Sequence, residues 1–385
     1  MYVIALQMLL ANRAKYAGMI LALTFASLLI TQQMSIFLGI LARSYSFITD
    51  AGLADIWVMD PRVQFIDDLR PLREISVLRV RRVPGVQWAV PLYKGLLKVR
   101  LSDGTFQTVN LIGLDDASLI GGPAEMRSGR LDSLHQPQAI IVDEIGAADK
   151  LARQLPDGRF VPLQVGDTVE VNDHRAVVVG ICRVGRTFQS QPVIYTTYAR
   201  ATAFAPLERK RLSFVLVSVR PGENVAQVAA RIRQETGLAA YPREAFKRLT
   251  ASYLLQYTGI AINFGIAVSL GFLVGTAVAG QTFYSFMLDN LRHFAMLKAM
   301  GTTSPMLLRM VLLQALWVGG IGYGLGVGLA ALAGHILRHT QLAFSMPWPL
   351  LGLSAAAILL ICLLSAAASV VKVLRLEPVT VFQSA

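Results

Sequence analysis

Four long stretches of this 385-residue chain contain no Asp, Glu, Lys or Arg, and they constrain the fold more than any other feature. They cover residues 16–42, 249–288, 310–337 and 339–371, with lengths of 27, 40, 28 and 33 residues. A helix needs about 20 apolar residues to cross the hydrocarbon of a bilayer, because each residue rises about 1.5 Å against roughly 30 Å. The sequence therefore predicts four transmembrane helices, one near the N-terminus and three grouped after a long polar segment.

Basic residues near the ends of these stretches predict which side of the membrane each loop faces. Short loops rich in Lys and Arg stay in the cytoplasm. The segment before span one, the loop between spans two and three and the segment after span four hold Arg13, Lys15, Arg292, Lys298, Arg309, Lys372 and Arg375. The loop between spans three and four offers only Arg338. We therefore expect both termini and the second loop inside, and the large polar segment outside.

These assignments divide the chain into segments with different expected environments. We expect an N-terminal segment at 1–15, span one at 16–42, the outer domain at 43–248 and span two with an outward extension at 249–288. A cytoplasmic loop at 289–305, span three at 306–337, an outer loop at 338–348, span four at 349–371 and a tail at 372–385 complete the chain.

Composition excludes several classes of function. About half of the net charge of +12 lies next to the membrane, and the outer domain balances 28 Lys and Arg against 22 Asp and Glu, which disfavours a nucleic-acid partner. Cys182 and Cys362 lie in different environments, so no disulfide is expected. His135 and His174 lack ligand-type neighbours, so no metal site is expected. No span carries a charge in its middle, which disfavours an ion-coupled carrier.

The outer domain reads as an α+β fold with a strand–helix–strand unit at each end. The first unit has strands at 54–60 and 86–90 around a helix at 71–83, which Pro71 begins. The second has a strand at 213–220 and a helix at 224–236, which Gly237 ends before another short strand. We expect these ends, residues 43–100 and 211–248, to form one lobe.

A β-rich insertion, residues 101–210, is expected to form a second lobe. Strands at 96–101 and 105–112 are joined through Ser102-Asp103-Gly104, and Asn172-Asp173-His174 joins two further strands. Those strands are predicted at 168–171 and 176–181, with another at 139–142 and a helix at 143–154. The fold class is thus an α+β membrane protein with four transmembrane helices and a two-lobed outer domain between helices one and two.

Two features of the membrane part indicate how it works. The stretch 249–288 would reach about 60 Å as one helix, so its more polar first part, up to residue 263, is expected to extend beyond the membrane and join the outer domain rigidly. Gly320, Gly324 and Gly328 repeat every four residues, which favours close helix packing. That packing face either slides during a cycle or is static.

The cytoplasmic loop contains a short segment with an unusual apolar pattern. Residues 291–300 are good helix formers, and Gly301 follows as a stop. Apolar residues go nearly all round this helix. We expect Phe294, Met296 and Leu297 to be exposed and to fit a hydrophobic groove on another protein.

This loop carries a resemblance to a known family. Residues 293–301, HFAMLKAMG, resemble the E-x-A-x-L-K-A-L/M-G segment of FtsX/MacB-like (type VII) ABC transporter permeases, with His293 at the acidic position. Residues 375–382, RLEPVTVF, are similar to the R-x-x-P-x-x-x-L/F tail of that family. The outer segments 85–86, 90–93 and 111–115 resemble the DevC branch in particular. The resemblance covers essentially the whole chain, including the order of one plus three spans.

The resemblance implies a homodimer in which each copy inserts the helix at 291–301 into a cleft of a separate ABC ATPase subunit. The implied ATPase-coupling residues are Leu291, Arg292, His293, Phe294, Ala295, Met296, Leu297, Lys298, Met300 and Gly301. Residues 1–13 would form an interfacial helix. ATP and magnesium would bind to the ATPase partner, because this chain has no G-x-x-x-x-G-K-[ST] and so no cofactor, catalytic residue or enzyme activity is expected on it.

The family also implies a mechanism. Its members move substrate outside the membrane by mechanotransmission, and the DevC branch works with a periplasmic membrane fusion protein and an outer-membrane channel. We therefore expect a permease in the bacterial inner membrane, surrounded by membrane lipid, that drives efflux of lipid-like or amphiphilic cargo through a tripartite pump. The alternatives are a division- or cell-wall-regulating scaffold and a haem or lipoprotein exporter. The size of the outer domain favours docking of a fusion protein.

Overall fold

The computed structural model describes residues 2–101, 103–154, 159–206, 212–337 and 342–374. The chain forms two compact units, which are described separately. Residues 1–40 and 259–385 form the membrane unit, and residues 41–258 form the outer unit. The predicted turn includes Ser102, and the predicted tail motif covers residues 375–382. These residues lie outside the described ranges.

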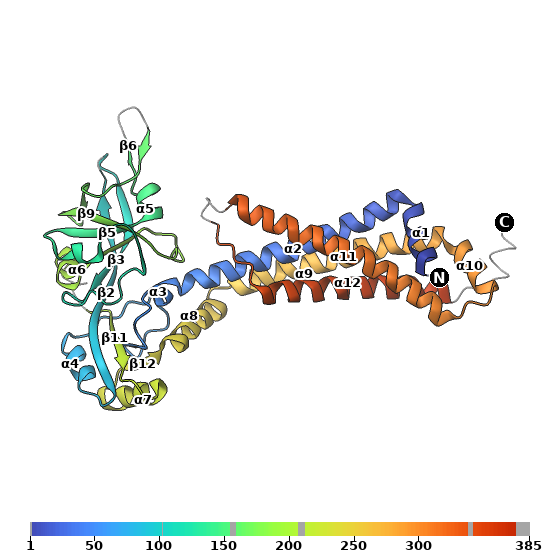
Figure 1. The fold of residues 1–385 in the computed structure, drawn as a ribbon. Coiled ribbons are helices and arrows are strands. Elements are labelled where there is room, and N and C mark those ends of the chain that lie inside the picture. The colour runs from blue at the N-terminus through green and yellow to red at the C-terminus, as the bar shows by residue number, and fades with distance from the viewer. Residues whose placement is uncertain (1, 102, 155–158, 207–211, 338–341, 375–385) are drawn as a thin grey trace. The chain divides into compact units, whose positions relative to one another are not determined.

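The membrane unit is built from helices (Figure 1). They are α1 (Tyr2–Ala11), α2 (Arg13–Ser44), α9 (Ile260–Asp289), α10 (Leu291–Ala299), α11 (Ser304–Ile336) and α12 (Trp348–Leu374). Four of them, α2, α9, α11 and α12, are long and apolar enough to cross a membrane, which confirms the four predicted spans. Their shared core contains large side chains that are at most 1% exposed, among them Leu23, Ile30, Phe283 and Phe286.

Glycines bring α2 and α11 together, but on a different face from the predicted one. A Cβ added at Gly326 would lie 2.5 Å from the Cβ of Ser27, and one at Gly322 would lie 2.7 Å from the Cβ of Leu23. By contrast, among the residues that the structure describes, an added Cβ would meet nothing within 4 Å at the predicted packing residues Gly320, Gly324 and Gly328. The four-residue period thus occurs on two faces of α11, and the role of Gly320, Gly324 and Gly328 in helix packing stays a prediction.

The stretch 249–288 is also not one helix. The outer unit ends in α8 (Arg243–Tyr257), and α9 begins only at Ile260. Between them Gly259 has a left-handed backbone with φ of +66°. A residue in this conformation ends the helical hydrogen-bond ladder, so the predicted uninterrupted helix is wrong. The uninterrupted helix is α2, which runs from Arg13 to Ser44.

The outer unit is organised around one ten-stranded sheet with the strand order β12-β1-β11-β2-β3-β10-β5-β9-β4, and β8 pairs with β2 and β9. The strands are β1 (Ile56–Met59), β2 (Val86–Arg100), β3 (Phe106–Leu114), β4 (Glu125–Gly129), β5 (Ala139–Asp143), β8 (Thr168–Val171), β9 (His174–Arg183), β10 (Val193–Thr197), β11 (Phe214–Val219) and β12 (Ala239–Pro242). A separate ribbon joins β6 (Arg153–Gln154) to β7 (Phe160–Val161). The helices are α3 (Ser46–Asp50), α4 (Ile75–Arg81), η1 (Leu131–His135), α5 (Glu144–Ala148), α6 (Tyr198–Phe204), α7 (Val225–Thr236) and α8.

The two predicted strand–helix–strand units are present and interleave. The units β1-α4-β2 and β11-α7-β12 form four antiparallel strands in the order β12-β1-β11-β2. Both faces are covered: Ile56 and Val58 belong to the core cluster that includes α4 and α7 residues, whereas Trp57 and Met59 belong to the cluster that includes Phe246 of α8. A strand buried on both faces carries apolar residues throughout instead of alternating ones.

The strand β2 joins the two halves of the sheet. Its residues from Val86 to Leu92 pair with β11, and those from Tyr93 to Arg100 pair with β3. The separate strands predicted at 86–90 and 96–101 are therefore one. The hairpin prediction at residues 172–174 is confirmed, since Val171 pairs with His174 and both Asn172 and Asp173 have positive φ.

Two predicted helices are shorter in the structure. The helix predicted from residue 71 begins at Ile75, because the amide of Leu72 donates a 2.8 Å hydrogen bond to the carbonyl of Leu212 in an isolated bridge. The helix predicted at 143–154 ends at Ala148, and Arg153 pairs with Val161 in a ribbon. In both cases, strand-type pairing replaces the local helical pattern, with a distant segment at Leu72 and with a segment eight residues away at Arg153.

Candidate functional site

The helix α10 forms the connection between α9 and α11, and local hydrogen bonds define both of its ends. Before it, the side-chain amide of Asn290 donates to the carbonyl of Phe286 at 2.9 Å. After it, Gly301 has a φ of +92°. The amide of Gly301 donates to the carbonyl of Lys298, and the amide of Thr302 donates to the carbonyl of Leu297. This pair of bonds is a Schellman motif, which confirms Gly301 as the predicted stop.

One face of α10 belongs to the core of the membrane unit. Phe294 and Ala295 have no exposed surface, and Leu297 is 6% exposed. Phe294 and Leu297 join the cluster that contains Phe283, Phe286, Met287, Leu307 and Met310. The prediction that Phe294 and Leu297 are exposed is therefore wrong. The helix is apolar nearly all round, so the sequence did not distinguish the side that packs from the side that is open.

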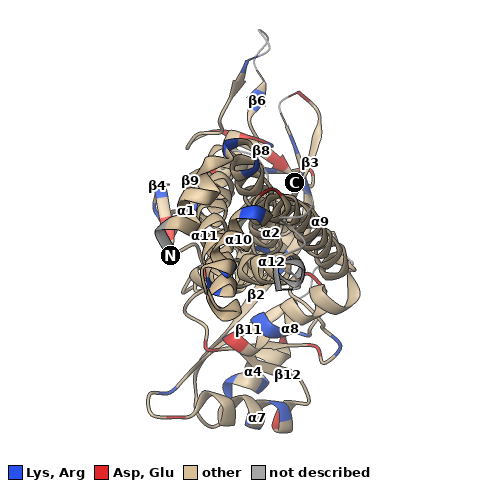
Figure 2. Cartoon of the chain, turned by 90° about the vertical axis from the view of Figure 1, so that its right-hand side faces the viewer, with Lys and Arg blue, Asp and Glu red and all other residues tan. Residues whose placement is uncertain are grey.

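The opposite face of α10 is open. Its exposed residues are Arg292, His293, Met296, Ala299 and Met300, with Leu291 and Lys298 half-buried at its margins. Their spacing of one, four, seven and eight residues places them on one helical face. Met296 is 43% exposed and Met300 is 74% exposed, so two flexible apolar side chains stand beside the cation Arg292. Figure 2 views the end of the membrane unit that carries this helix.

An ion pair that the sequence analysis did not predict lies just before the start of α10. The ammonium of Lys15, in the first turn of α2, pairs with Asp289 at the end of α9. It also donates to the hydroxyl of Ser285 at 2.8 Å and to the carbonyl of the same residue at 3.2 Å. Asn12 donates to Asp289 at 3.4 Å. The available signal was that Lys15 and Asp289 are opposite charges just outside two spans, on the same predicted side.

The N-terminal helix α1 packs on the same unit. Ala5 and Leu9 are fully buried, and the side-chain amide of Gln314 in α11 donates to the carbonyl of Ala5 at 2.7 Å. Ile4 and Leu10 are exposed. This helix therefore has one face on α11 and an open apolar remainder, and its interfacial position stays a prediction.

Chemical sites are sparse in the part of the chain that the structure describes. Among those residues, no three His, Cys, Asp or Glu side chains gather as metal ligands would. Both cysteines are buried thiols, and Cys182 lies in the core of the outer unit, where burial raises its pKa.

Two family models match the chain in succession. The MacB-like periplasmic core domain matches residues 17–235, and the FtsX-like permease C-terminal model matches residues 253–378. The first covers span one and most of the outer unit, and the second covers spans two to four with α10. The first alone matches more than half of the chain.

Sequence relatives carry a consistent description. Two uncharacterized ABC transporter permeases from Mycobacterium tuberculosis strains CDC 1551 and H37Rv are 26% identical over 269 residues, which is 68% of this chain and 65% of theirs. An uncharacterized ABC transporter permease from Methanocaldococcus jannaschii is 23% identical over 182 residues, 46% of this chain and 45% of its own length. The chain thus matches less than two thirds of the length of these relatives.

Two solved structures resemble part of this chain. The periplasmic region of MacB from Actinobacillus actinomycetemcomitans is 16% identical, with a TM-score of 0.39, 52% of this chain covered and 94% of that one. The extracellular domain of the noncanonic ABC-type transporter YknZ from Gram-positive bacteria is 14% identical, with a TM-score of 0.35, 49% of this chain covered and 98% of that one.

The matches agree with the architecture built above. The periplasmic core model matches the segment that holds α2 and most of the α+β outer unit, and the permease model matches the segment that holds the other three spans. The chain is a multi-pass membrane protein and belongs to the MacB/FtsX family of ABC transporter permeases.

Proposed function

We propose that this permease couples a separate ABC ATPase to its outer unit through the open face of α10. The observation that carries the proposal is that one face of α10 is buried in the membrane unit while the opposite face is exposed. Phe294 and Leu297 anchor it to the membrane unit, while Met296 and Met300 face outward. Because α10 is packed into the core of the membrane unit, a force applied to its open face would be transmitted to the membrane-spanning helices.

The chemistry of the open face specifies the cleft that would receive it. Methionine side chains adapt to irregular apolar surfaces, and Arg292 at their edge favours carboxylates. The matching cleft therefore has an apolar floor and an acidic rim. The Lys15–Asp289 pair would help to hold the loop in a fixed position for that contact.

We further propose that ATP-driven motion reaches the outer unit by mechanotransmission in a homodimer placed in a bacterial inner membrane. The cargo would be lipid-like or amphiphilic and would leave through a tripartite pump with a periplasmic membrane fusion protein and an outer-membrane channel. The supporting observation is that the spans α2, α9, α11 and α12 carry no Asp, Glu, Lys or Arg in their middle, so they lack the groups that a polar route would need.

Photo-crosslinking in intact cells tests the docking surface. A benzophenone side chain is introduced at Met296 of the full chain, and crosslinked products are identified by mass spectrometry. We expect an ABC ATPase subunit as the main product. The matched control places the same group at Leu53, which is 68% exposed in the outer unit and outside the proposed contact.

The outcome is decisive in both directions. An ATPase captured at Met296 and absent at Leu53 supports the coupling role. Absence of any ATPase from the Met296 products, in cells where the variant reaches the membrane, would overturn it. Variants of Phe294 are unsuitable for this purpose, because Phe294 is buried and its loss would disturb the fold itself.

A further inference from the structure

A small cavity in the outer unit lies against the strands β2 and β3. It has a volume of about 50 Å³. Its walls come from the connection after β1, from the two strands and from the connection between β9 and β10, and they include Asp67, Leu69, Lys94, Leu96, Asn110 and Gln189. A water molecule takes up about 30 Å³ in the liquid, so the cavity admits a group of only a few non-hydrogen atoms.

Lys94 brings a buried positive charge to this cavity. Its side chain is 3% exposed, and its ammonium pairs with the carboxylate of Asp67, which is 45% exposed. An ammonium group carries three donors. Within the described chain the ammonium of Lys94 makes this one hydrogen bond, so two of its donors remain for a ligand.

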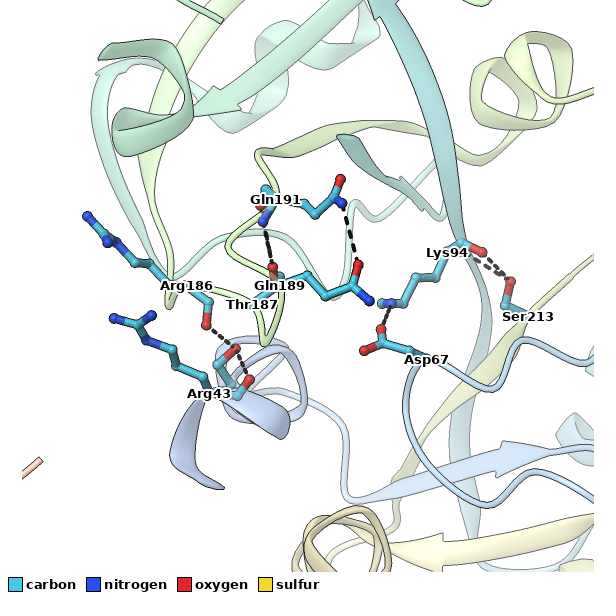
Figure 3. Close-up of polar contacts among 9 residues, drawn as sticks. Arg43, Asp67, Lys94, Arg186, Thr187, Gln189, Gln191 and Ser213 are labelled. Atoms are coloured by element: carbon cyan, nitrogen blue, oxygen red, sulfur yellow. Dashed lines mark hydrogen bonds and ion pairs between the residues drawn. The ribbon is translucent and has the colours of Figure 1, made fainter. Parts of the chain in front are cut away.

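Two carboxamides add further donors to the same cavity. Asn110 is 5% exposed, and among the described residues its side chain has no hydrogen-bond partner. Gln189 is oriented by Gln191, whose Nε2 donates to the Oε1 of Gln189 at 3.4 Å. The Nε2 of Gln189 is thereby turned toward the ammonium of Lys94 (Figure 3). The hydroxyl of Thr187 accepts the backbone amide of Gln191 at 3.1 Å, which holds this loop in place.

Donors that face one another across a cavity are complementary to an acceptor placed between them. Buried donors without a partner cost free energy, and bonds from such donors to a carboxylate are among the strong ones. Asp67 already takes one donor of Lys94, but it is exposed on the connection between β1 and α4, where water solvates it when it turns away. Leu96 is 39% exposed and Leu69 is half-buried, so the cavity also has an apolar side.

We propose that Lys94, Asn110 and Gln189 bind the carboxylate of a small monocarboxylic acid. Asp67 competes with this ligand for the ammonium of Lys94. The apolar substituent of the acid would lie against Leu69 and Leu96. This inference concerns the outer unit alone and is independent of the coupling role of α10.

Saturation-transfer difference NMR tests the site on the full chain in lipid nanodiscs, with empty nanodiscs as the background. The probe is butyrate, and butyramide is its uncharged analogue. The variants are Lys94→Met, Gln189→Ala and Asp67→Asn. The matched control is Lys98→Met, the same substitution at an exposed position of β2 that does not line the cavity.

We expect butyrate to bind equally to the wild type and to Lys98→Met, and butyramide to bind to neither. Gln189→Ala should weaken binding about tenfold, because one donor to a charged group is lost, and Lys94→Met should weaken it further. Asp67→Asn should bind butyrate more tightly than the wild type, because the competing carboxylate is removed. Damage to the fold would lower binding in both variants of the ion pair, so the opposite signs identify the site.

Three results would overturn the proposal. The first is no binding of butyrate to the wild type at millimolar concentration, and the second is undiminished binding to Lys94→Met or weaker binding to Asp67→Asn. The third is equal competition by chloride, since any small anion would then occupy the cavity. Tighter binding of N-acetylleucine, a mimic of a protein C-terminus, would overturn the assignment to a free acid.

Discussion

At the scale of single residues, Asp143 shows how one carboxylate holds a junction together. It is 8% exposed, it caps α5 by accepting from Gly146, and it accepts from Val193 at the start of β10. Asp143→Ala would remove the cap and leave the buried amide of Val193 without a partner. We expect a loss of about 2–4 kcal/mol. Hydrogen exchange of β5 and β10 in the full chain measures it, and unchanged protection there would contradict the assignment.

The same residue gives a pH dependence with a definite sign. Burial raises the pKa of Asp143 above its ordinary value of 3.8, and its two amide hydrogen bonds offset only part of that increase. The folded state thus holds the proton more tightly than the unfolded state. Its contribution to stability is largest below pH 3.8 and declines as the pH rises through the folded pKa.

Asp143→Asn tests that sign, because an amide cannot ionise. We expect the stability advantage of the wild type over this variant to shrink as the pH is raised from below 3.8 toward neutrality. Chemical denaturation of the full chain at a series of pH values provides the measurement. An advantage that grows with pH would show that the folded pKa is depressed instead.

Lys94 is a second residue whose environment sets its role. Its side chain is 3% exposed and pairs with Asp67, which is 45% exposed. Lys94 lies where β2 changes partner, and the hydroxyl of Ser213 bonds to both its amide and its carbonyl at 3.0 Å. Asp67→Ala would leave a buried ammonium uncompensated, so we expect a loss of about 2 kcal/mol.

Lys94→Met should cost less than Asp67→Ala, because it removes the charge together with its need for a partner. Thermal unfolding of both variants as full chains compares them. Equal losses would mean that the lost ion pair accounts for the whole effect and that the unpaired ammonium of Lys94 adds no cost of its own.

At the scale of elements, the two glycine faces of α11 provide a matched comparison. Gly326→Ala would place a methyl group 2.5 Å from the Cβ of Ser27, so α2 and α11 would have to separate. We expect a loss of about 1–3 kcal/mol. Gly324→Ala meets nothing within 4 Å in the described chain and should be neutral or stabilising. Melting temperatures in detergent decide between them, and a greater loss for Gly324→Ala would contradict the contact.

Element prediction succeeded where one local rule dominated. Asn224 and Gly237 delimit α7 almost as expected, since a side-chain cap and a left-handed glycine are local signals. It failed where pairing with another segment decides, as at Leu72 and Arg153. For α10 the helix and its stop were predictable, but its packed face was not. Apolar residues recur on both sides of this helix, so the pattern alone does not show that Phe294 is buried and Met296 is open.

At the scale of the whole molecule, hydropathy and charge were enough to predict four spans and the outer domain, because lipid imposes length and polarity on every crossing. The sequence did not predict equally well how the chain passes between the two units. The chain passes from unit to unit twice, within α2 between Ile40 and Leu41 and again between Thr258 and Gly259. A long apolar run concealed the break at Gly259, since glycine is also common inside membrane helices.

These two links should differ in how they carry motion. An unbroken helix resists bending and stretching through its hydrogen bonds, and α2 is unbroken at its crossing point. At the other link the left-handed Gly259 interrupts the hydrogen-bond ladder. If nucleotide-driven work is relayed to the outer unit, a Gly-Gly insertion after Ile40 should abolish the relay, whereas the same insertion after Thr258 should weaken it only slightly. Each insertion variant is the control for the other.

Spin labels are placed at Arg130, next to β4, and at Arg233, in α7. Pulsed electron–electron double resonance then measures the distance between them in the complex with the ATPase. Both positions are exposed, and they lie near opposite ends of the outer sheet, because β4 is the last strand at one end and α7 packs beside β12 at the other. We expect ATP to shift the distance between the labels in the parent chain and in the variant extended after Thr258, but not in the one extended after Ile40. Because the labels lie within one unit, a shift requires deformation of that unit and not mere reorientation. An equal response in both insertion variants would show that α2 is not the stiffer link.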